Sequence, residues 1–305
     1  MRQQAVRAPV MRLLSLPHRL LSAALGMATS IAIIATTSPS LATAQQVFKV
    51  GFDVRNTQLE DAKQYRPFLD YLGKATGYRF EIRFSKKGEN IADLLGKGGV
   101  DFAFIGAHTY LEAREKYGAV PLVRGLNSQG KAEYQAAIVV KSGSPINSVG
   151  KLRGKRFAFG GRLSTQGHLI PMIELSKHGV YLRNLAGHGF TGSHRNCAQA
   201  VAKGEFDAGG MQDQLAKELA DEGILRIIHM SSYYPSSGVA ANKNVPNVVL
   251  KRVKQACIDF QPKGRDAEGL YNWDKTEMPN GFKEARDSDY TVMRKYALKF
   301  KLLQR

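Results

Sequence analysis

The stretch Phe157-Ala-Phe-Gly-Gly-Arg-Leu-Ser-Thr-Gln-Gly-His-Leu-Ile-Pro171 decides the fold, because the rest of the chain can be arranged around it. It reads as a short buried strand, a glycine turn and the start of a helix with Ser164 at the N-cap. A helix start leaves N–H groups unpaired and carries the positive end of the dipole, so it attracts an anion. Pro171 would meet the carbonyl of Gly167 in a regular helix, which predicts a kinked turn. On this pattern alone, an ordinary capped helix is the simpler interpretation.

Residues 1–44 have the pattern of a secretory leader. Four arginines precede the apolar run 20–36, and Ala42-Thr43-Ala44 fits an A-x-A cleavage site. Ser22, Thr29 and Ser30 interrupt the apolar run, which argues against a permanent membrane anchor. We therefore expect cleavage near residue 45 and a soluble product in the periplasm.

The formal net charge of the 305-residue chain is +18. A balance of this size suits nucleic acid, anionic lipid or anionic solutes. Nucleic acid fits poorly, because the chain has no arginine-rich tract and no aromatic–basic stacking motif. We expect no nucleic-acid partner.

Strands and helices alternate from residue 47 onward. Strands are expected at 47–52, 78–84 and 102–105, with helices at 59–76 and 91–95 between them. This alternation predicts a parallel, doubly wound α/β sheet. Ligands bind such sheets beyond the carboxyl ends of the strands, here around residues 106–110.

The pattern begins again at Tyr134, and Lys-Gly-x-x-Asp precedes a short strand once in each half, at Lys97 and Lys203. A strand at 238–242 then leads back to the first half, and helices at 248–260 and 288–303 are expected to pack there. The expected fold is therefore two lobes with two crossings, near Tyr134 and Ser236, which form a hinge with a cleft at its base. The boundaries are 45–135 for the first part of lobe one, 136–235 for lobe two and 236–305 for the return to lobe one.

Five ordered segments resemble a known family, and a tail segment, 280–290, fits it as well. They are 134–146, Leu152-Arg-Gly-Lys155, Ser164-Thr-Gln-Gly-His-Leu-Ile-Pro171, Gly192-Ser-His194 and Gly204-Glu-Phe-Asp-Ala208. The match is to the phosphate, phosphite and phosphonate-binding proteins of ABC transporters. The resemblance implies a bilobed type II periplasmic binding protein, with two doubly wound α/β lobes joined by a two-strand hinge. Such a protein would close on a small tetrahedral oxyanion.

The resemblance also implies the ligand-binding residues. The anion clamp of the family, Ser-Thr-Ser-Gly, falls on Ser164, Thr165, Gln166 and Gly167, with an amide in place of the third hydroxyl. The cleft histidine of the family falls on His194, and its hinge-side tyrosine falls on Tyr134. A partly protonated histidine ring and a tyrosine hydroxyl are both donors suited to a phosphorus oxyanion.

The departures from the family bear on specificity. The carboxylates that hold an ammonium group in aminoalkylphosphonate binders are replaced by Gln214 and Ser237, so such a ligand is not expected. The neighbouring Asp213 can accept a hydrogen bond from a protonated oxyanion. In the facing lobe we expect further contacts from His108 and Tyr110.

Two other classes of function were weighed. An enzyme is not expected, because no catalytic residues, metal ligands or cofactor motif stand out, and Ser164 has no obvious base. The alternative is a periplasmic oxyanion sensor, including an arsenite sensor, that signals to a membrane histidine kinase. We expect a monomer whose partners are a small oxyanion and the permease of an ABC transporter, or such a kinase.

The two cysteines, Cys197 and Cys257, fall in different predicted lobes. An even number of cysteines in an exported protein is typical of a disulfide. A bridge between lobes would oppose hinge motion, so two buried free thiols are the preferred prediction.

Overall fold

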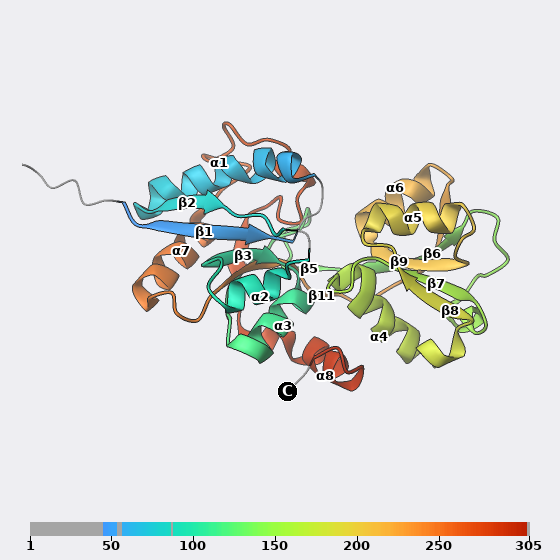
Figure 1. Cartoon of the computed structure of the whole chain (residues 1–305). Helices are drawn as coiled ribbons and strands as arrows, with labels where there is room; N and C mark the ends of the chain where they lie inside the picture. Colours follow the sequence, from blue (N-terminus) through green and yellow to red (C-terminus); the bar gives the residue numbers. More distant parts are fainter. Residues whose placement is uncertain (1–44, 54–56, 87, 304–305) are drawn as a thin grey trace, which may run out of the picture. The chain divides into compact units, whose positions relative to one another are not determined.

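Lobe one is built on a six-stranded sheet in the order β13-β4-β12-β3-β1-β2 (Figure 1). The computed structural model describes residues 45–53, 57–86 and 88–303, so the predicted leader lies outside the described residues. The strands are β1 Val47–Phe52, β2 Arg79–Ile82, β3 Phe102–Ile105, β4 Val120–Gly125, β12 Gly238–Ala241 and β13 Phe282–Glu284. The helices are α1 Gln58–Thr76, α2 Ile91–Gly96, α3 Ala107–Tyr117, α7 Asn247–Asp259 and α8 Thr291–Lys299.

Lobe two is built on a five-stranded sheet in the order β10-β6-β9-β7-β8. Its strands are β6 Ala136–Lys141, β7 Arg156–Phe159, β8 Gly187–Phe190, β9 Ala208–Gln212 and β10 Leu225–Met230. Its helices are α4 Ile170–Lys177, α5 His194–Ala202 and α6 Asp213–Asp221. Short single turns lie at Val149–Leu152, Leu182–Asn184, Trp273–Lys275 and Asp287–Tyr290.

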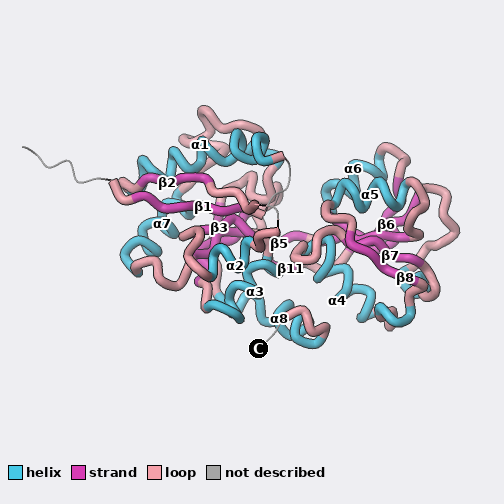
Figure 2. Tube along the Cα trace, in the orientation of Figure 1, coloured by secondary structure: helices cyan, strands magenta, loops and turns pink. Residues whose placement is uncertain are grey.

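Alternation along β6 and β7 explains why helices cover both faces of this sheet. Ile138 and Phe157 face a core cluster that includes residues of α4, whereas Val139 and Ala158 face one that includes residues of α5 and α6. Successive side chains of a strand point to opposite faces, so a strand apolar on both faces needs cover on both. Figure 2 shows α4 on one side of these strands and α5 and α6 on the other.

The sheets are mixed, which differs from the parallel sheets that the alternation predicted. β1 pairs in parallel with β2 and β3, but β12 runs antiparallel to both β3 and β4. In lobe two β6 is antiparallel to its neighbours β9 and β10. The antiparallel strands β6 and β12 immediately follow the two crossings between lobes. The α/β class and the bilobed architecture are confirmed.

The Lys-Gly-x-x-Asp segments form the same turn in each lobe. Gly98 and Gly204 both take the left-handed conformation, with φ of 79° and 78°. Asp101 accepts a hydrogen bond from the backbone N–H of Lys49 at 2.7 Å. Asp207 accepts one from the N–H of Arg156, also at 2.7 Å. Each aspartate thus ties the turn to the first residues of a neighbouring strand.

The two crossings pair with each other. β5 (Glu133–Tyr134) and β11 (Tyr234–Pro235) form a two-stranded antiparallel sheet in which Tyr134 lies opposite Tyr234. Both tyrosines are buried. This pairing is the two-strand hinge expected from the sequence.

The cysteines are free thiols in separate cores. Cys197 packs in lobe two among residues of α5 and α6, and Cys257 packs in the aromatic core of lobe one. Burial raises the pKa of the Cys197 thiol to about 12, opposed only by a hydrogen bond to Gly210, so the thiol stays protonated. The preferred prediction of two buried free thiols is confirmed.

Candidate functional site

A cleft of about 820 Å³ is lined by residues of both lobes and of the hinge. Tyr134 and Ser237 line it at the hinge. Lobe two contributes the loop 161–166, the first residues of α5 and the start of α6. Lobe one contributes Asp53, the start of α1, Gly106 and the loop 272–277. Of the sequence-predicted site residues, Tyr134, Ser164, Thr165, Gln166 and His194 line this cleft.

A wide helical turn, Thr165–Leu169, leads directly into α4. Its hydrogen bonds skip one residue more than in an α-helix: the N–H of Leu169 donates to the Ser164 carbonyl and that of Ile170 to the Thr165 carbonyl. Pro171 has no N–H, and the Gly167 carbonyl accepts from the Gly160 N–H at 2.9 Å instead. The kink expected from Pro171 is therefore present, as a π-type turn.

Ser164 caps this turn, because its Oγ accepts a hydrogen bond from the Gly167 N–H at 2.9 Å. The hydroxyl hydrogen of Ser164 remains available to a ligand. The backbone N–H groups of Thr165 and Gln166 stand at the helix start, before any intrahelical acceptor. The N–H of Gly167 is used by the cap, so the donors offered to an anion are those of Thr165 and Gln166.

Only glycine fits at position 167, because a side chain there would collide with its neighbours. A Cβ at this position would lie 2.8 Å from Ser164 Oγ, 3.1 Å from His194 Cε1 and 3.2 Å from the Gly160 Cα. The turn, the cap and the histidine ring can therefore approach one another only at a glycine.

His194 opens α5, where Ser193 caps the helix by accepting from the Asn196 N–H at 3.1 Å. The Nδ1 of His194 accepts a hydrogen bond from the backbone N–H of Gln212 at 3.2 Å. A backbone N–H can only donate, so the hydrogen of the neutral ring sits on Nε2. This geometry favours a neutral donor over the partly protonated ring suggested by the sequence.

The start of α3 in lobe one is already occupied. Asp53 accepts from the Gly106 N–H at 2.9 Å and from the Thr109 hydroxyl at 3.1 Å. The N–H of His108 donates to Thr165 Oγ1 at 3.0 Å. The N–H groups of Gly106 and His108 are thus already bonded to the protein's own oxygens and are not free to bind an anion.

His108 and Tyr110 accordingly lie outside the cleft lining. The His108 ring is buried beside His168, and burial followed by that neighbour lowers its pKa to about 3. The Tyr110 hydroxyl donates to Asp287 at 2.5 Å, and its ring packs on Tyr290. Burial first, and then this hydrogen bond, raises the pKa of Tyr110. The structure does not bring either side chain to the predicted site.

The loop 272–277 is a part of the cleft that sequence reasoning missed. Asn272 adopts a left-handed backbone with φ of 48°, and its carbonyl accepts from Gln64 Nε2 at 2.6 Å. Trp273 anchors the loop, packing its ring at 5.2 Å from Phe68. This segment has no helical or strand period in the sequence, and the pair Asn272-Trp273 was the one sign that it forms an ordered loop.

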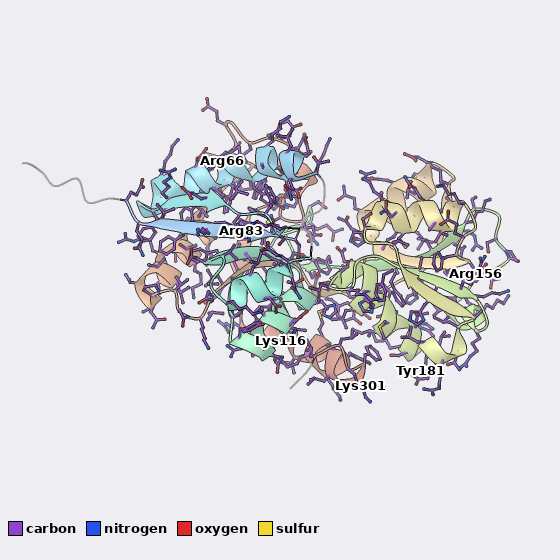
Figure 3. The ribbon with its side chains drawn as sticks, in the orientation of Figure 1. Arg66, Arg83, Lys116, Arg156, Tyr181 and Lys301 are labelled. Atoms are coloured by element: carbon purple, nitrogen blue, oxygen red, sulfur yellow. The ribbon has the colours of Figure 1, made fainter. Side chains whose placement is uncertain are left out.

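The charge of the cleft differs in sign from that of the chain. Its lining carries five carboxylates and two cations. These are Asp53, Glu60, Glu218, Asp274 and Glu277, against Arg195 and Lys275. Figure 3 labels Arg66 and Lys116 on lobe one and Arg156 on lobe two, all exposed and outside the cleft lining. An anion in this cleft would therefore depend on oriented hydrogen-bond donors rather than on excess positive charge.

One group among the described residues has the composition of a metal site: Glu174, His178 and His229. The carboxylate of Glu174 is already engaged, by Lys177 at 2.9 Å, Tyr234 at 2.8 Å and His229 at 2.9 Å. Burial alone would raise the pKa of Glu174, but these hydrogen bonds outweigh it and lower the pKa. We therefore interpret the group as a hydrogen-bonded link between α4 and the hinge strand β11.

No helix among the described residues is long and apolar enough to cross a membrane. The two lobes, the paired hinge strands and the cleft between them define a bilobed solute-binding protein of type II. The chain belongs to the family described as ABC transporter, phosphonate, periplasmic substrate-binding protein, which matches residues 51–290. Membership implies a small-molecule ligand, a membrane permease as partner and a periplasmic location.

Two relatives, and the solved structure of one of them, illustrate the family. A probable ABC transporter phosphite-binding protein, PhnD1, of Prochlorococcus marinus is 29% identical over 166 residues, which are 52% of this chain and 50% of that protein. The phosphate-import protein PhnD of Mycolicibacterium smegmatis is 26% identical over 251 residues, 75% of this chain and 78% of that protein. The solved structure of P. marinus PhnD1 with methylphosphonate superposes with a TM-score of 0.72 at 20% identity, covering 84% and 98% of the two chains. The chain thus spans about half the length of the first curated relative.

Proposed function

We propose that this protein captures a small phosphorus oxyanion, namely phosphate, phosphite or a small phosphonate, for an ABC transporter. One observation carries the proposal: the capped turn at Ser164 and the start of α5 at His194 meet in a single cleft. A Cβ added at Gly167 would lie 3.1 Å from His194 Cε1, so the two helix starts are in direct contact. Their donors can therefore reach one tetrahedral anion together.

The proposed contacts are divided by element. The N–H groups of Thr165 and Gln166 and the hydroxyl of Ser164 would donate to the oxyanion from lobe two. His194 would donate from Nε2, and Tyr134 lines the cleft at the hinge. Asp213 lies behind Gln166 and acts on the ligand through it. His108 and Tyr110 are not among the proposed contacts.

The relatives support this ligand class. One is a phosphite-binding protein, one imports phosphate, and a solved structure holds methylphosphonate. We also propose that residues 1–44 are a leader removed on export and that the lobes divide at 45–135, 136–235 and 236–305. We further propose a monomeric binding protein without catalytic activity, metal or cofactor. The relatives do not favour the alternative of a sensor that signals to a histidine kinase.

Calorimetry of residues 45–305 against a panel of oxyanions tests the proposal. We expect a Kd on the order of 1 µM or below for at least one of phosphate, phosphite and methylphosphonate. Arsenite is expected to give no heat, because the two buried thiols lie outside the cleft lining. The absence of binding heat with every phosphorus oxyanion in the panel would contradict the proposal.

A further inference from the structure

The orientation of the Gln166 amide is fixed by its partners. Its Nε2 donates to the backbone carbonyl of Gln135 at 2.8 Å and to Asp213 Oδ1 at 3.2 Å. A carbonyl oxygen can only accept, so the nitrogen of the amide must face Gln135. Both amide hydrogens are thereby committed to the protein. Gln166 is 4% exposed, so burial holds the side chain in this arrangement.

The carbonyl oxygen of the same side chain is left for the ligand. Among the residues that the structure describes, no donor bonds to Gln166 Oε1, although the residue lines the cleft beside Thr165. An acceptor oxygen next to an anion site repels the oxygens of the anion unless the ligand supplies a hydrogen. A serine at this position, as in the resembling family, could donate instead. The substitution therefore replaces a potential donor by an obligatory acceptor.

The charges around Gln166 also disfavour a fully ionised anion. The cleft lining holds more carboxylates than cations, which disfavours a ligand of high negative charge. Burial raises the pKa of Asp213, and the nearby Glu277 raises it further against the opposing effect of Lys217. The burial of this region and the charge of Glu277 therefore both disfavour an additional negative charge beside Gln166.

We propose that Gln166 Oε1 restricts the cleft to phosphorus oxyanions that keep one hydroxyl hydrogen, and that it rejects fully ionised tetrahedral anions such as sulfate and sulfonates. The inference rests on the proposed function. The P–OH hydrogen is donated to Oε1, while the remaining oxygens accept from the N–H groups of Thr165 and Gln166. Phosphate groups undergo their second ionisation near pH 6 to 7, so both forms exist at neutral pH. Sulfate and sulfonates have no hydrogen to donate in this range.

Ionisable groups of the protein near Gln166 and in the cleft lining must be separated from the ligand. They are Asp213 and Lys217 of α6, His194 of α5, and the cleft carboxylates Asp53 and Glu277. A protein group would give the same midpoint with every ligand. A proton carried by the ligand would give a midpoint that follows the second pKa of that ligand.

The test is calorimetry of the wild-type protein between about pH 5.5 and 9 with phosphate, methylphosphonate and difluoromethylphosphonate, whose second pKa values differ. Above the second pKa of each ligand we expect affinity to fall about tenfold per pH unit, with a midpoint that shifts from ligand to ligand. Sulfate and methanesulfonate should bind at least about 100-fold more weakly than phosphate at pH 6. A midpoint common to all ligands, affinity independent of pH, or sulfate binding equal to phosphate binding would each overturn the inference.

Gln166→Ser supplies the second arm. Its hydroxyl can donate, so the pH slope should flatten and the penalty on sulfate should shrink by about tenfold or more. Gln199→Ser, at an exposed position of α5, is the matched control and should keep the wild-type slope. A wild-type slope in Gln166→Ser would count against the role of Oε1. If Gln166→Ser does not fold, the ligand series on the wild type still decides, and an absence of all phosphorus-oxyanion binding would instead overturn the proposed function.

Discussion

Gly167→Ala is expected to abolish measurable binding of phosphorus oxyanions. The new Cβ would lie 2.8 Å from Ser164 Oγ and 3.2 Å from the Gly160 Cα, and the backbone on that side cannot withdraw. Ser164 would lose its cap geometry, which costs about 0.5–2 kcal/mol, and the His194 ring would be displaced from the anion. With about 1–3 kcal/mol for each disturbed ligand contact, the loss reaches at least about 100-fold in Kd.

Calorimetry and a thermal melt of the same samples check this prediction. Gly160→Ala is the control, because a Cβ there meets nothing nearer than 3.4 Å. The control should retain binding within about threefold. Wild-type affinity in Gly167→Ala would show that binding does not depend on the close approach of the Ser164 turn to the His194 ring at this glycine.

His194→Ala is expected to weaken binding by about 10- to 100-fold, which corresponds to losing one hydrogen bond to a charged ligand. It also leaves the Gln212 N–H without its Nδ1 acceptor, so a small decrease in melting temperature should accompany the loss. Because the ring donates as a neutral imidazole, the pH slope of binding should survive the substitution.

His188→Ala, at an exposed position of β8, is the matched histidine control and should bind like the wild type. A pH slope that disappears in His194→Ala would mean that a charged His194, and not a proton on the ligand, governs the pH dependence. Unchanged affinity would return His194 to a purely structural role.

The local parts of the site could be predicted from the sequence because neighbouring residues specify them. Ser164 caps the turn, Pro171 imposes the wide geometry, and Ser193 caps the helix that presents His194. The hinge strands and the turn that ends in Asp101 or Asp207 also followed from short patterns. Each of these features depends on contacts within one or two adjacent elements.

The remaining parts depend on partners distant in sequence. Gln166 owes its orientation to Gln135 and Asp213, which lie 31 and 47 residues away. The start of α3 was expected to contribute ligand contacts, but its Gly106 N–H donates to Asp53, which lies 53 residues away. Strand β4 and helix α6 were not predicted, and the loop 272–277 carries no helical or strand period. Tertiary packing alone sets these positions.

Amide NMR of the folded chain tests most directly whether the oxyanion binds at the helix starts. Titration with methylphosphonate should move the amide protons of Thr165 and Gln166 downfield, because a charge-assisted hydrogen bond to an anion deshields its N–H proton. The amides of the exposed basic turn at Arg153 and Lys155 should barely respond. Saturable shifts confined to that basic turn, with Thr165 and Gln166 unmoved, would contradict the proposed site.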